Sequence, residues 1–265
     1  MLTLEKKKKP VVLIEEVEGL LCFMEECPKL VSGKNEKEVS LAREEICERH
    51  EISVNSLVFP NQIGGDKIVE VFEKDRGASI LSSNKGPIED TDGLFTRDYG
   101  VFLVAYAADC PIVVYYDPVK KVCGVAHAGY EGTGKRLPGK MVDFFIANGS
   151  KSSDIRVTIC PSALACCYDV VNAVDKDYPE PCRWKRFKSE FGEGSVRMAF
   201  NPKTKKSGAF LDLLFCNKQS LLRRGILEEN IDASHCICTI CSGLPSHYRE
   251  REKRTRTLLA VVGMQ

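Results

Sequence analysis

Histidine is scarce in this chain of 265 residues, which contains four histidines and a single tryptophan. A cluster of several copper ions needs many ligands, most of them histidines, so the scarcity argues against an oxidase built on such a cluster. Long apolar runs are also missing, and none approaches the roughly 20 residues that span a bilayer. No apolar signal-peptide core follows the lysines near the N-terminus. We therefore expect a cytoplasmic protein without a membrane segment.

An excess of charge of either sign is absent too. The sequence has 38 Lys and Arg against 37 Asp and Glu, a formal net charge of +1. Proteins that bind nucleic acid or anionic membranes neutralise phosphates with clustered basic residues, and the four lysines at 6–9 are too few and too close to the terminus to do so. We expect neither partner. Internal repeats and low-complexity linkers are missing as well, so we expect a single domain over residues 1–265.

Cysteine, in contrast, is abundant, with 13 residues. A small secreted protein would form disulfides from them, but this chain is long enough to build a large core. We expect reduced thiols, most of them buried as small apolar side chains. The segment 235–241 reads H-C-I-C-T-I-C, which has the spacing of half a structural zinc site. Because the vicinal pair at 166–167 and the pair Cys22 and Cys27 look like poor partners for it, we interpret these cysteines as packing residues.

Apolar patterns predict mixed secondary structure. The predicted strands cover residues 11–14, 19–24, 67–72, 101–107, 111–116, 122–127, 154–160, 196–200, 233–239 and 257–263. Capping signals and helical periodicity predict helices at 35–50, 138–148, 168–174 and 213–224, and the Pro-, Lys- and Gly-containing segment 175–194 reads as a loop. Several strands follow one another without an intervening helix. This order favours an α+β fold of mixed, layered β-sheets flanked by helices over a regular βαβ array.

The stretch V-A-H-A-G-Y-E-G-T-G-K-R at 125–136 has two interpretations. Gly129, Gly134 and Lys135 imitate a phosphate-binding P-loop, but that motif needs a hydroxyl after the lysine, and this chain has Arg136. Pro138 also delays the helix whose first amides would face the phosphate. We therefore reject the P-loop and turn to His127.

Cys110 and His127 each lie at the end of a predicted strand. If the strands are neighbours, the two side chains can converge, either as a thiol activated by an imidazole or as two ligands of one metal ion. The simpler alternative is a buried cysteine and a hydrogen-bonded histidine at a strand end. A basic cluster near the C-terminus, 246–256, is likewise either a solvated turn or an anion clamp, since the arginine fork matches phosphate geometry.

Short motifs from about residue 54 onward occur in an order that resembles one known family. They are Q-I-G-G-D at 62–66, A-D-C-P at 108–111, A-H-A-G-Y-E-G at 126–132, C-P-S-A-L-A-C-C-Y-D-V at 160–170, D-L at 212–213, C-T-I-C at 238–241 and S-H-Y-R at 246–249. The chain resembles the YfiH-type family, also called laccase-domain or multicopper polyphenol oxidase-like. The N-terminal part, residues 1–53, is divergent. The resemblance implies an α/β/β/α sandwich.

The resemblance also implies a function. Members of the family are described as purine nucleoside phosphorylases that act on adenosine, inosine and methylthioadenosine and can deaminate adenosine. By this resemblance the partners are a purine nucleoside and phosphate, the cofactor is zinc, and the catalytic residues Cys110 and His127 are also the metal ligands. The implied substrate-binding residues are Gln62, Asp109, Arg249 and Arg256, of which the two arginines would take phosphate.

One position departs from the family pattern in a way that affects function. The first of three centre residues in the family is a histidine, and this chain has Gly64 there. A catalytic zinc normally has three protein ligands, so two hypotheses follow. The chain is a working purine nucleoside phosphorylase, or it is a catalytically impaired member that acts as a binding or scaffold protein. Copper oxidation of phenols, as the older family label suggests, is disfavoured by the four histidines.

Overall fold

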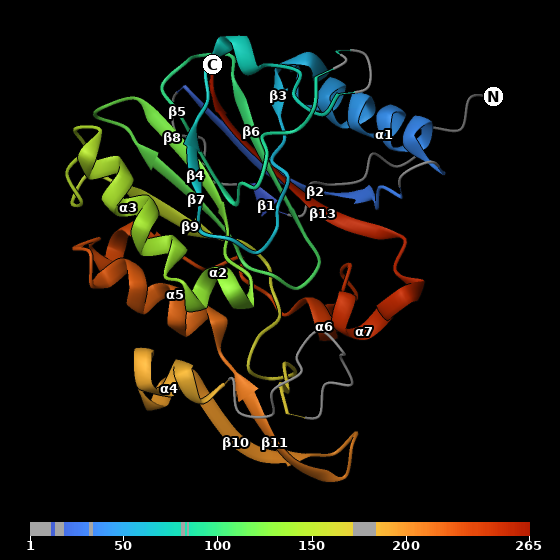
Figure 1. Ribbon diagram of the computed structural model, residues 1–265, viewed down its shortest axis with the longest axis vertical. Helices are drawn as coiled ribbons and strands as arrows, with labels where there is room; N and C mark the ends of the chain where they lie inside the picture. Colours follow the sequence, from blue (N-terminus) through green and yellow to red (C-terminus); the bar gives the residue numbers. More distant parts are fainter. Residues whose placement is uncertain (1–11, 14–18, 32–33, 81–82, 84, 172–183) are drawn as a thin grey trace.

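A computed structural model describes residues 12–13, 19–31, 34–80, 83, 85–171 and 184–265. Two β-sheets form its centre (Figure 1). The first has the strand order β1-β2-β13-β6-β3 and the second the order β12-β9-β7-β8-β5-β4. The strands of the first sheet are β1 (Val12–Leu13), β2 (Leu20–Pro28), β3 (Leu57–Val58), β6 (Phe102–Ala107) and β13 (Arg256–Met264).

The second sheet is mixed in direction. Its strands are β4 (Ile68–Glu70), β5 (Gly93–Thr96), β7 (Ile112–Asp117), β8 (Val122–His127), β9 (Arg156–Ile159) and β12 (Ile231–Asp232). Strands β5, β8, β7 and β9 pair antiparallel, whereas β4 and β12 add parallel edges. A separate antiparallel hairpin consists of β10 (Val196–Asn201) and β11 (Lys206–Leu211).

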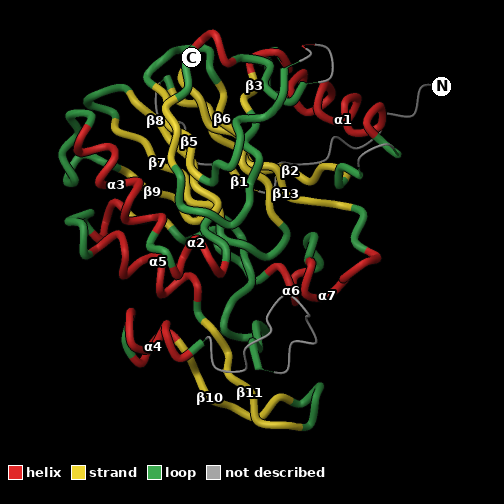
Figure 2. Tube along the Cα trace, in the orientation of Figure 1, coloured by secondary structure: helices red, strands yellow, loops and turns green. Residues whose placement is uncertain are grey.

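Seven α-helices and several 3-10 turns lie around the sheets in the described part of the chain (Figure 2). The α-helices are α1 (Glu36–Arg49), α2 (Tyr130–Gly134), α3 (Leu137–Ala147), α4 (Lys185–Phe191), α5 (Leu213–Leu222), α6 (Thr239–Ser242) and α7 (His247–Glu250). The 3-10 turns are Val54–Ser56, Glu73–Asp75, Glu193–Ser195, Glu228–Asn230 and Arg251–Lys253. No helix in the described ranges is long and apolar enough to cross a membrane.

Alternating side chains explain why the sheets stack. Side chains of a strand point to opposite faces in turn. In β7, Ile112 and Val114 join the core between the two sheets, whereas Val113 and Tyr115 join the core under α3 and α5. The other face of the first sheet packs against α1. Both faces of each sheet are therefore covered, and the layers follow the order helices, sheet, sheet, helix that the resemblance implies.

Most predicted elements are confirmed with small shifts at their ends, including the long apolar strands β6, β7 and β8 and the helices α1, α3 and α5. Three predictions are wrong in the described ranges. Residues 168–171 form turns and a bridge instead of a helix, since the Asp169 carboxylate binds the Val171 N–H and the Asn201 side chain. The expected strand at 233–239 is absent: a turn and an isolated bridge at Cys238 lie between β12, which ends at Asp232, and α6, which begins at Thr239. Helix α4 occupies part of the expected loop 175–194, because Phe187 and Phe191 are buried against the hairpin. Residues 172–183 lie outside the described ranges.

The rejection of a P-loop agrees with the backbone at 129–137. Arg136 adopts a left-handed conformation with φ of 61° and precedes α3, which begins at Leu137. The Lys135 ammonium donates to the Gly64 carbonyl at 3.1 Å. This lysine thus ties two loops together and does not extend over a phosphate-binding helix end.

Candidate active site

Cys110 and His127 come together where the two sheets meet. Cys110 lies in the turn 108–111, which carries the chain from β6 in the first sheet to β7 in the second. His127 is the last residue of β8 and pairs in register with Ile112 of β7. Because antiparallel neighbours place the end of one strand beside the start of the next, the cysteine and the histidine lie side by side. The side chain of His127 is 14% exposed, so solvent or a ligand reaches it.

Asp92 holds the histidine. It directly precedes β5, the strand on the other side of β8, and its carboxylate lies 2.8 Å from Nδ1 of His127. The His127 backbone N–H also donates to the Asp92 carbonyl at 2.8 Å. With Nδ1 committed to Asp92, Nε2 is the ring nitrogen left for chemistry. The sequence interpretation missed Asp92, because the pairing of β5 with β8 that places it beside His127 joins segments far apart in the chain.

The charges around His127 favour its protonated form. Burial alone would lower its pKa, but the Cys110 sulfur and the Asp92 carboxylate raise the pKa of His127 from 6.5 to about 10. Asp92 is also buried, which would raise its pKa, yet hydrogen bonds from His127 and the Gly65 N–H lower it. The pair is therefore an imidazolium and a carboxylate at neutral pH.

Two glycines of the motif at 126–132 allow this close arrangement. A Cβ atom on Gly129 would lie 2.7 Å from the Cys110 sulfur and 3.5 Å from Cε1 of His127. A Cβ atom on Gly132 would lie 2.9 Å from the His127 carbonyl oxygen. Real Cβ contacts as short as 2.7 or 2.9 Å do not occur, so only glycine lets the backbone after β8 pass so near to both residues.

The loop 62–66 forms the third side of the site. Its backbone N–H groups at Ile63, Gly64 and Gly65 donate to the Asp92 carboxylate at 3.2, 3.1 and 2.6 Å. Gly64 has φ of +73°, and a Cβ atom there would meet only Cβ of Glu131, at 3.8 Å. The loop thus keeps a fixed shape and offers no side chain to the centre at position 64.

The residues present do not make a three-ligand metal site at Cys110 and His127. Such a site needs a third donor close to the first two. In the described ranges, three or more ligand atoms of His, Cys, Asp or Glu lie within 4.8 Å of one another only in a group of four cysteines elsewhere. The zinc that the resemblance implies therefore finds two of its three expected ligands at this centre.

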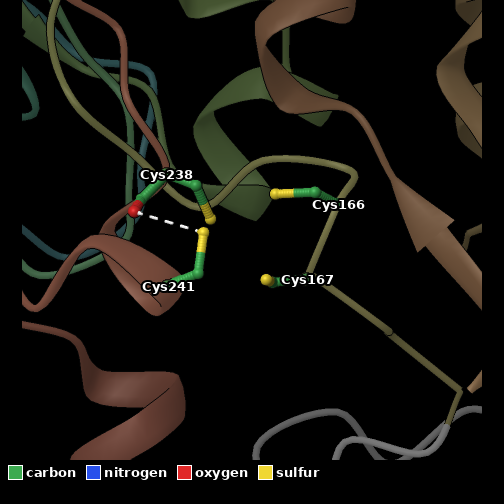
Figure 3. Close-up of side chains that lie close together, drawn as sticks. All are labelled: Cys166, Cys167, Cys238 and Cys241. Atoms are coloured by element: carbon green, nitrogen blue, oxygen red, sulfur yellow. Dashed lines mark hydrogen bonds between the residues drawn. The ribbon is translucent and has the colours of Figure 1, made fainter. Parts of the chain in front are cut away.

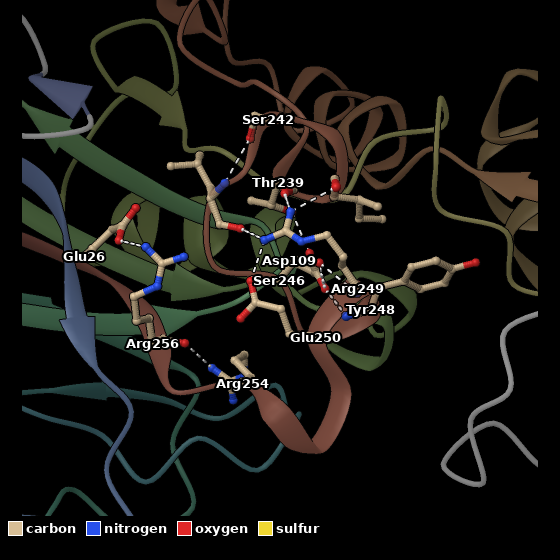
Figure 4. Close-up of polar contacts among 12 residues, drawn as sticks. Glu26, Asp109, Thr239, Ser242, Ser246, Tyr248, Arg249, Glu250, Arg254 and Arg256 are labelled. Atoms are coloured by element: carbon tan, nitrogen blue, oxygen red, sulfur yellow. Dashed lines mark hydrogen bonds and ion pairs between the residues drawn. The ribbon is translucent and has the colours of Figure 1, made fainter.

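The other predicted substrate-binding residues near the centre make contacts within the protein. The Gln62 amide donates to the Tyr106 carbonyl at 2.8 Å and accepts from the Tyr106 N–H at 2.9 Å. Asp109 is buried with φ of 95°, a strained conformation for a residue with a side chain. Its carboxylate accepts from Thr239 Oγ1 at 2.6 Å, Ser246 Oγ at 3.1 Å and the Tyr248 N–H at 2.5 Å (Figure 4). These bonds hold the turn that carries Cys110 against the C-terminal segment.

The arginines of the C-terminal segment differ in how many partners they have (Figure 4). Arg249 donates to the carbonyls of Thr239, Ile240 and Leu244 and pairs with Glu250. Arg256 pairs with Glu26. Arg254 donates Nη1 to the Arg256 carbonyl at 3.0 Å, but its buried Nε has no hydrogen-bond partner among the described residues. Burial lowers the pKa of Arg254, and the charges of Asp109, Glu250 and Cys110 act on it in the opposite direction.

A cavity of about 300 Å³ opens beside Arg254. The cationic side chains of Lys29, Arg43 and Arg254 line it, and no carboxylate does so among the described lining residues. Nε of Arg43 is also buried without a hydrogen-bond partner in the described structure. A second, smaller cavity of about 60 Å³ lies against Cys110 and His247. The first has the size of a small-molecule site, whereas the second holds about two waters.

Comparison with known proteins identifies the family. The family model described as multi-copper polyphenol oxidoreductase laccase matches residues 29–265. The chain belongs to this laccase-like family. The resemblance inferred from the motifs and the α+β fold are both confirmed.

Relatives of the chain carry names that describe nucleoside chemistry. A purine nucleoside phosphorylase, YlmD of Bacillus subtilis, is 33% identical over 227 residues, which are 84% of this chain and 76% of that protein. A protein named adenosine deaminase RL5, from an unknown prokaryotic organism, is 26% identical over 70% of this chain and 66% of its own length. The solved structure of a hypothetical protein YfiH from Bacillus licheniformis superposes with a TM-score of 0.80 at 27% identity, covering 96% of each chain.

The laccase-like name is not matched by a copper cluster in the described structure. His50 ends α1 and bonds to Glu25, His127 bonds to Asp92, and His247 begins α7. No group of three close ligand residues within the described ranges includes a histidine.

Proposed function

We propose that the chain is a purine nucleoside phosphorylase that cleaves adenosine, inosine or methylthioadenosine with inorganic phosphate. One observation carries the proposal: Asp92 holds the His127 ring beside Cys110, and the charge of Cys110 also acts on Arg254, which lines a cavity together with Lys29 and Arg43. Phosphorolysis needs an acid for the leaving base and cations that bind phosphate. The names of the relatives support the same class of reaction.

Phosphate is proposed to bind between Arg43 and Arg254. Both guanidinium groups have a buried Nε that lacks a partner in the described structure, and an unpaired buried donor is costly until an acceptor arrives. Arg249 and Arg256, the residues that the resemblance implies, would first have to release backbone carbonyls or Glu26. Of these three C-terminal arginines, Arg254 thus needs the least rearrangement to bind phosphate.

His127 is proposed to act as the general acid. In phosphorolysis the bond between C1′ of the ribose and the purine nitrogen breaks as a phosphate oxygen bonds to C1′. The leaving purine takes the electron pair of that bond and needs a proton, which protonated His127 supplies at Nε2. Monobasic phosphate returns a proton to the imidazole, so the balance closes. Asp92 keeps the ring oriented throughout and stabilises its protonated form before and after the transfer.

Zinc enters the proposal only as an ion that Cys110 and His127 would hold. A bound zinc ion would supply Lewis acidity there, and these two side chains would hold it. Since the described residues supply two of the three ligands such an ion takes, no step above depends on it.

The test compares three arginine variants in a phosphorolysis assay that measures free base from adenosine, inosine and methylthioadenosine. Arg254→Ala is expected to raise KM for phosphate by about tenfold or more, the loss of one charge-assisted contact of about 1.5 to 3 kcal/mol, with KM for the nucleoside little changed. Arg256→Ala is the matched control, because its side chain pairs with Glu26. A larger effect of Arg256→Ala or Arg249→Ala would place phosphate where the resemblance implies. Formation of inosine from adenosine in the absence of phosphate would indicate deamination instead of phosphorolysis.

A catalytically impaired binding protein is the second candidate, and Gly64 is the observation that favours it. The backbone at Gly64 leaves space for a side chain, since the nearest atom would lie 3.8 Å from an added Cβ. The positive φ of +73° would cost a non-glycine residue about 1 to 2 kcal/mol. Activity in the natural chain that Cys110→Ala abolishes would exclude this candidate. Activity that appears only in Gly64→His would establish it.

A further inference from the structure

Four cysteines that lie outside the active site form a compact group (Figure 3). Cys166 and Cys167 belong to the loop after β9, Cys238 directly precedes α6, and Cys241 lies within it. All four sulfur atoms lie within 4.8 Å of one another. The vicinal pair, which the sequence interpretation judged a poor partner for the C-x-x-C segment, lies beside it, because the fold joins two segments that are about 70 positions apart in the sequence.

The spacing of the sulfurs matches a tetrahedral metal site. Zinc–thiolate bonds are about 2.3 Å long, so the sulfur atoms at the corners of a zinc tetrahedron are about 3.8 Å apart. Every pair in the group already lies within 4.8 Å. Figure 3 shows the side chains pointing from two sides toward a common centre.

Packing does not explain this group. Eight other described cysteines include seven that are buried, as expected for small apolar side chains, together with the active-site residue Cys110. In the group, however, Cys166 and Cys241 are exposed and Cys167 is half-buried. A polar function for these thiols accounts for their exposure. None of the described cysteines forms a disulfide.

The surroundings of Cys238 favour a thiolate. Burial alone would raise its pKa, but the backbone N–H groups of Leu164 and Cys241 and the Cys166 thiol lower it. Burial and the nearby Cys238 sulfur raise the pKa of Cys167 to about 11.

We propose that Cys166, Cys167, Cys238 and Cys241 bind one zinc ion in a closed structural site. Four soft thiolate ligands select zinc over hard cations such as Mg²⁺ or Ca²⁺. Because protein sulfurs occupy all four positions, the ion has no open position for water or substrate. Its role is therefore structural and separate from any metal at Cys110 and His127.

The zinc ion connects the two segments that support the active-site turn. The Ser162 N–H donates to the Ile237 carbonyl at 3.2 Å, and the Thr239 N–H donates to the Ser162 carbonyl at 3.0 Å. The Ala163 N–H donates to the Asp109 carbonyl at 2.7 Å, and Thr239 Oγ1 donates to the Asp109 carboxylate. A metal cross-link a few residues away fixes both contacts at once. Losing the ion is expected to loosen Asp109, and with it the position of Cys110.

The experiment measures zinc in the purified full-length chain and its ligands by X-ray absorption at the zinc edge. We expect about one zinc per chain with a first shell of four sulfurs. Cobalt added to the chelator-treated protein should give the intense thiolate charge-transfer and d–d bands of tetrahedral coordination. Cys238→Ser, Cys166→Ser and Cys241→Ser are expected to reduce zinc to less than about a tenth of an equivalent. The last two replace exposed residues, so their folding, checked by circular dichroism, should survive.

Two control variants separate this site from its surroundings and from the active site. Cys236 lies in the same segment but outside the group, so the variant Cys236→Ala should keep the bound zinc. The double variant Cys110→Ser, His127→Ala should also keep it, even though it loses any phosphorolysis. Absence of zinc uptake, a disulfide within the group, iron in place of zinc, or a mixed nitrogen and sulfur shell lost in the double variant would each overturn the proposal.

Discussion

Replacing Asp92 with asparagine should weaken both the fold and the chemistry at His127. One Asp92 oxygen accepts from the N–H groups of Ile63 and Gly65, and the other accepts from Gly64 and from Nδ1 of His127. An asparagine must point its NH2 group at one of these pairs, so a donor faces donors in either orientation. If the NH2 faces the imidazole, the ring is driven to the neutral form with its proton on Nε2, which is a weak acid.

The size of the effect follows from the pKa of His127. Its rise from 6.5 to about 10 corresponds to at most about 5 kcal/mol of stabilisation, at 1.36 kcal/mol for each tenfold change in affinity for the proton. Cys110 supplies part of this, so we expect Asp92→Asn to lower the free energy of unfolding by about 3 kcal/mol at pH 6. A general acid contributes about 10²- to 10⁴-fold to a rate, and kcat/KM should fall within that range.

The pH dependence gives the sharper test. Because folding raises the pKa of His127, its contribution is complete below pH 6.5 and is lost as pH rises toward about 10. Folding lowers the pKa of Asp92, so its contribution is complete above its ordinary pKa of 3.8 and is lost at still lower pH. The stability difference between the natural chain and Asp92→Asn should therefore be largest between about pH 4 and 6.5.

Urea unfolding of both proteins at intervals from pH 5 to 10, with chelator present, measures this difference. Asp66→Asn is the matched control from the same region, since Asp66 pairs with Lys140 on the surface and such pairs contribute about 0 to 1 kcal/mol. A difference that stays constant from pH 6 to 10 would refute an imidazolium–carboxylate pair. A variant with unchanged kcat/KM would refute the role of Asp92 in positioning the acid.

Two further predictions concern single contacts. Gly129→Ala should abolish phosphorolysis, because its added Cβ would lie 2.7 Å from the Cys110 sulfur. The control Gly86→Ala has no atom within 4 Å of its added Cβ and should leave the rate of phosphorolysis unchanged. Equal rates in the two variants would contradict the packing argument. Glu25→Gln should destabilise the fold by about 1 to 3 kcal/mol near neutral pH, because buried Glu25 joins β2 to Arg49 and His50 at the end of α1. Bonds from His50 and Arg49 outweigh burial and lower the pKa of Glu25, so the effect should fade as pH drops below about 4.5, and denaturation at pH 3 and pH 7 checks it.

The sequence predicted the parts of the fold that depend on local pattern. Strands β6, β7 and β8 are long apolar runs, and α1 has a clear period and a turn residue, Asn35, at its start. Strands β5 and β11 were missed because both contain few strongly apolar residues, and the pairing of β5 is set by the distant strand β8. Local propensity does not report such pairing.

The candidate site likewise contains some residues that local motifs predict and others that only the fold brings together. Cys110 and His127 follow from motifs at strand ends, but Asp92, Arg43 and Arg254 do not, since each reaches the site through contacts between segments far apart in the chain. The four-cysteine group needs the pairing of Ser162 with Cys238, which no spacing rule reveals. The predicted roles of Arg249 and Arg256 are tested by the arginine variants proposed above, and those of Gln62 and Asp109 stay predictions.

The absence of a side chain at Gly64 does not affect the contacts that hold the loop 62–66. Three successive N–H groups of the loop bind the Asp92 carboxylate, and the Lys135 ammonium binds the Gly64 carbonyl. These are backbone contacts, so they hold the loop in the same place whatever residue occupies the position. Asp92 in turn orients His127, and this links the loop to the proposed acid. The loop, Asp92 and His127 thus form one connected set of contacts, and a glycine at position 64 leaves all of them in place.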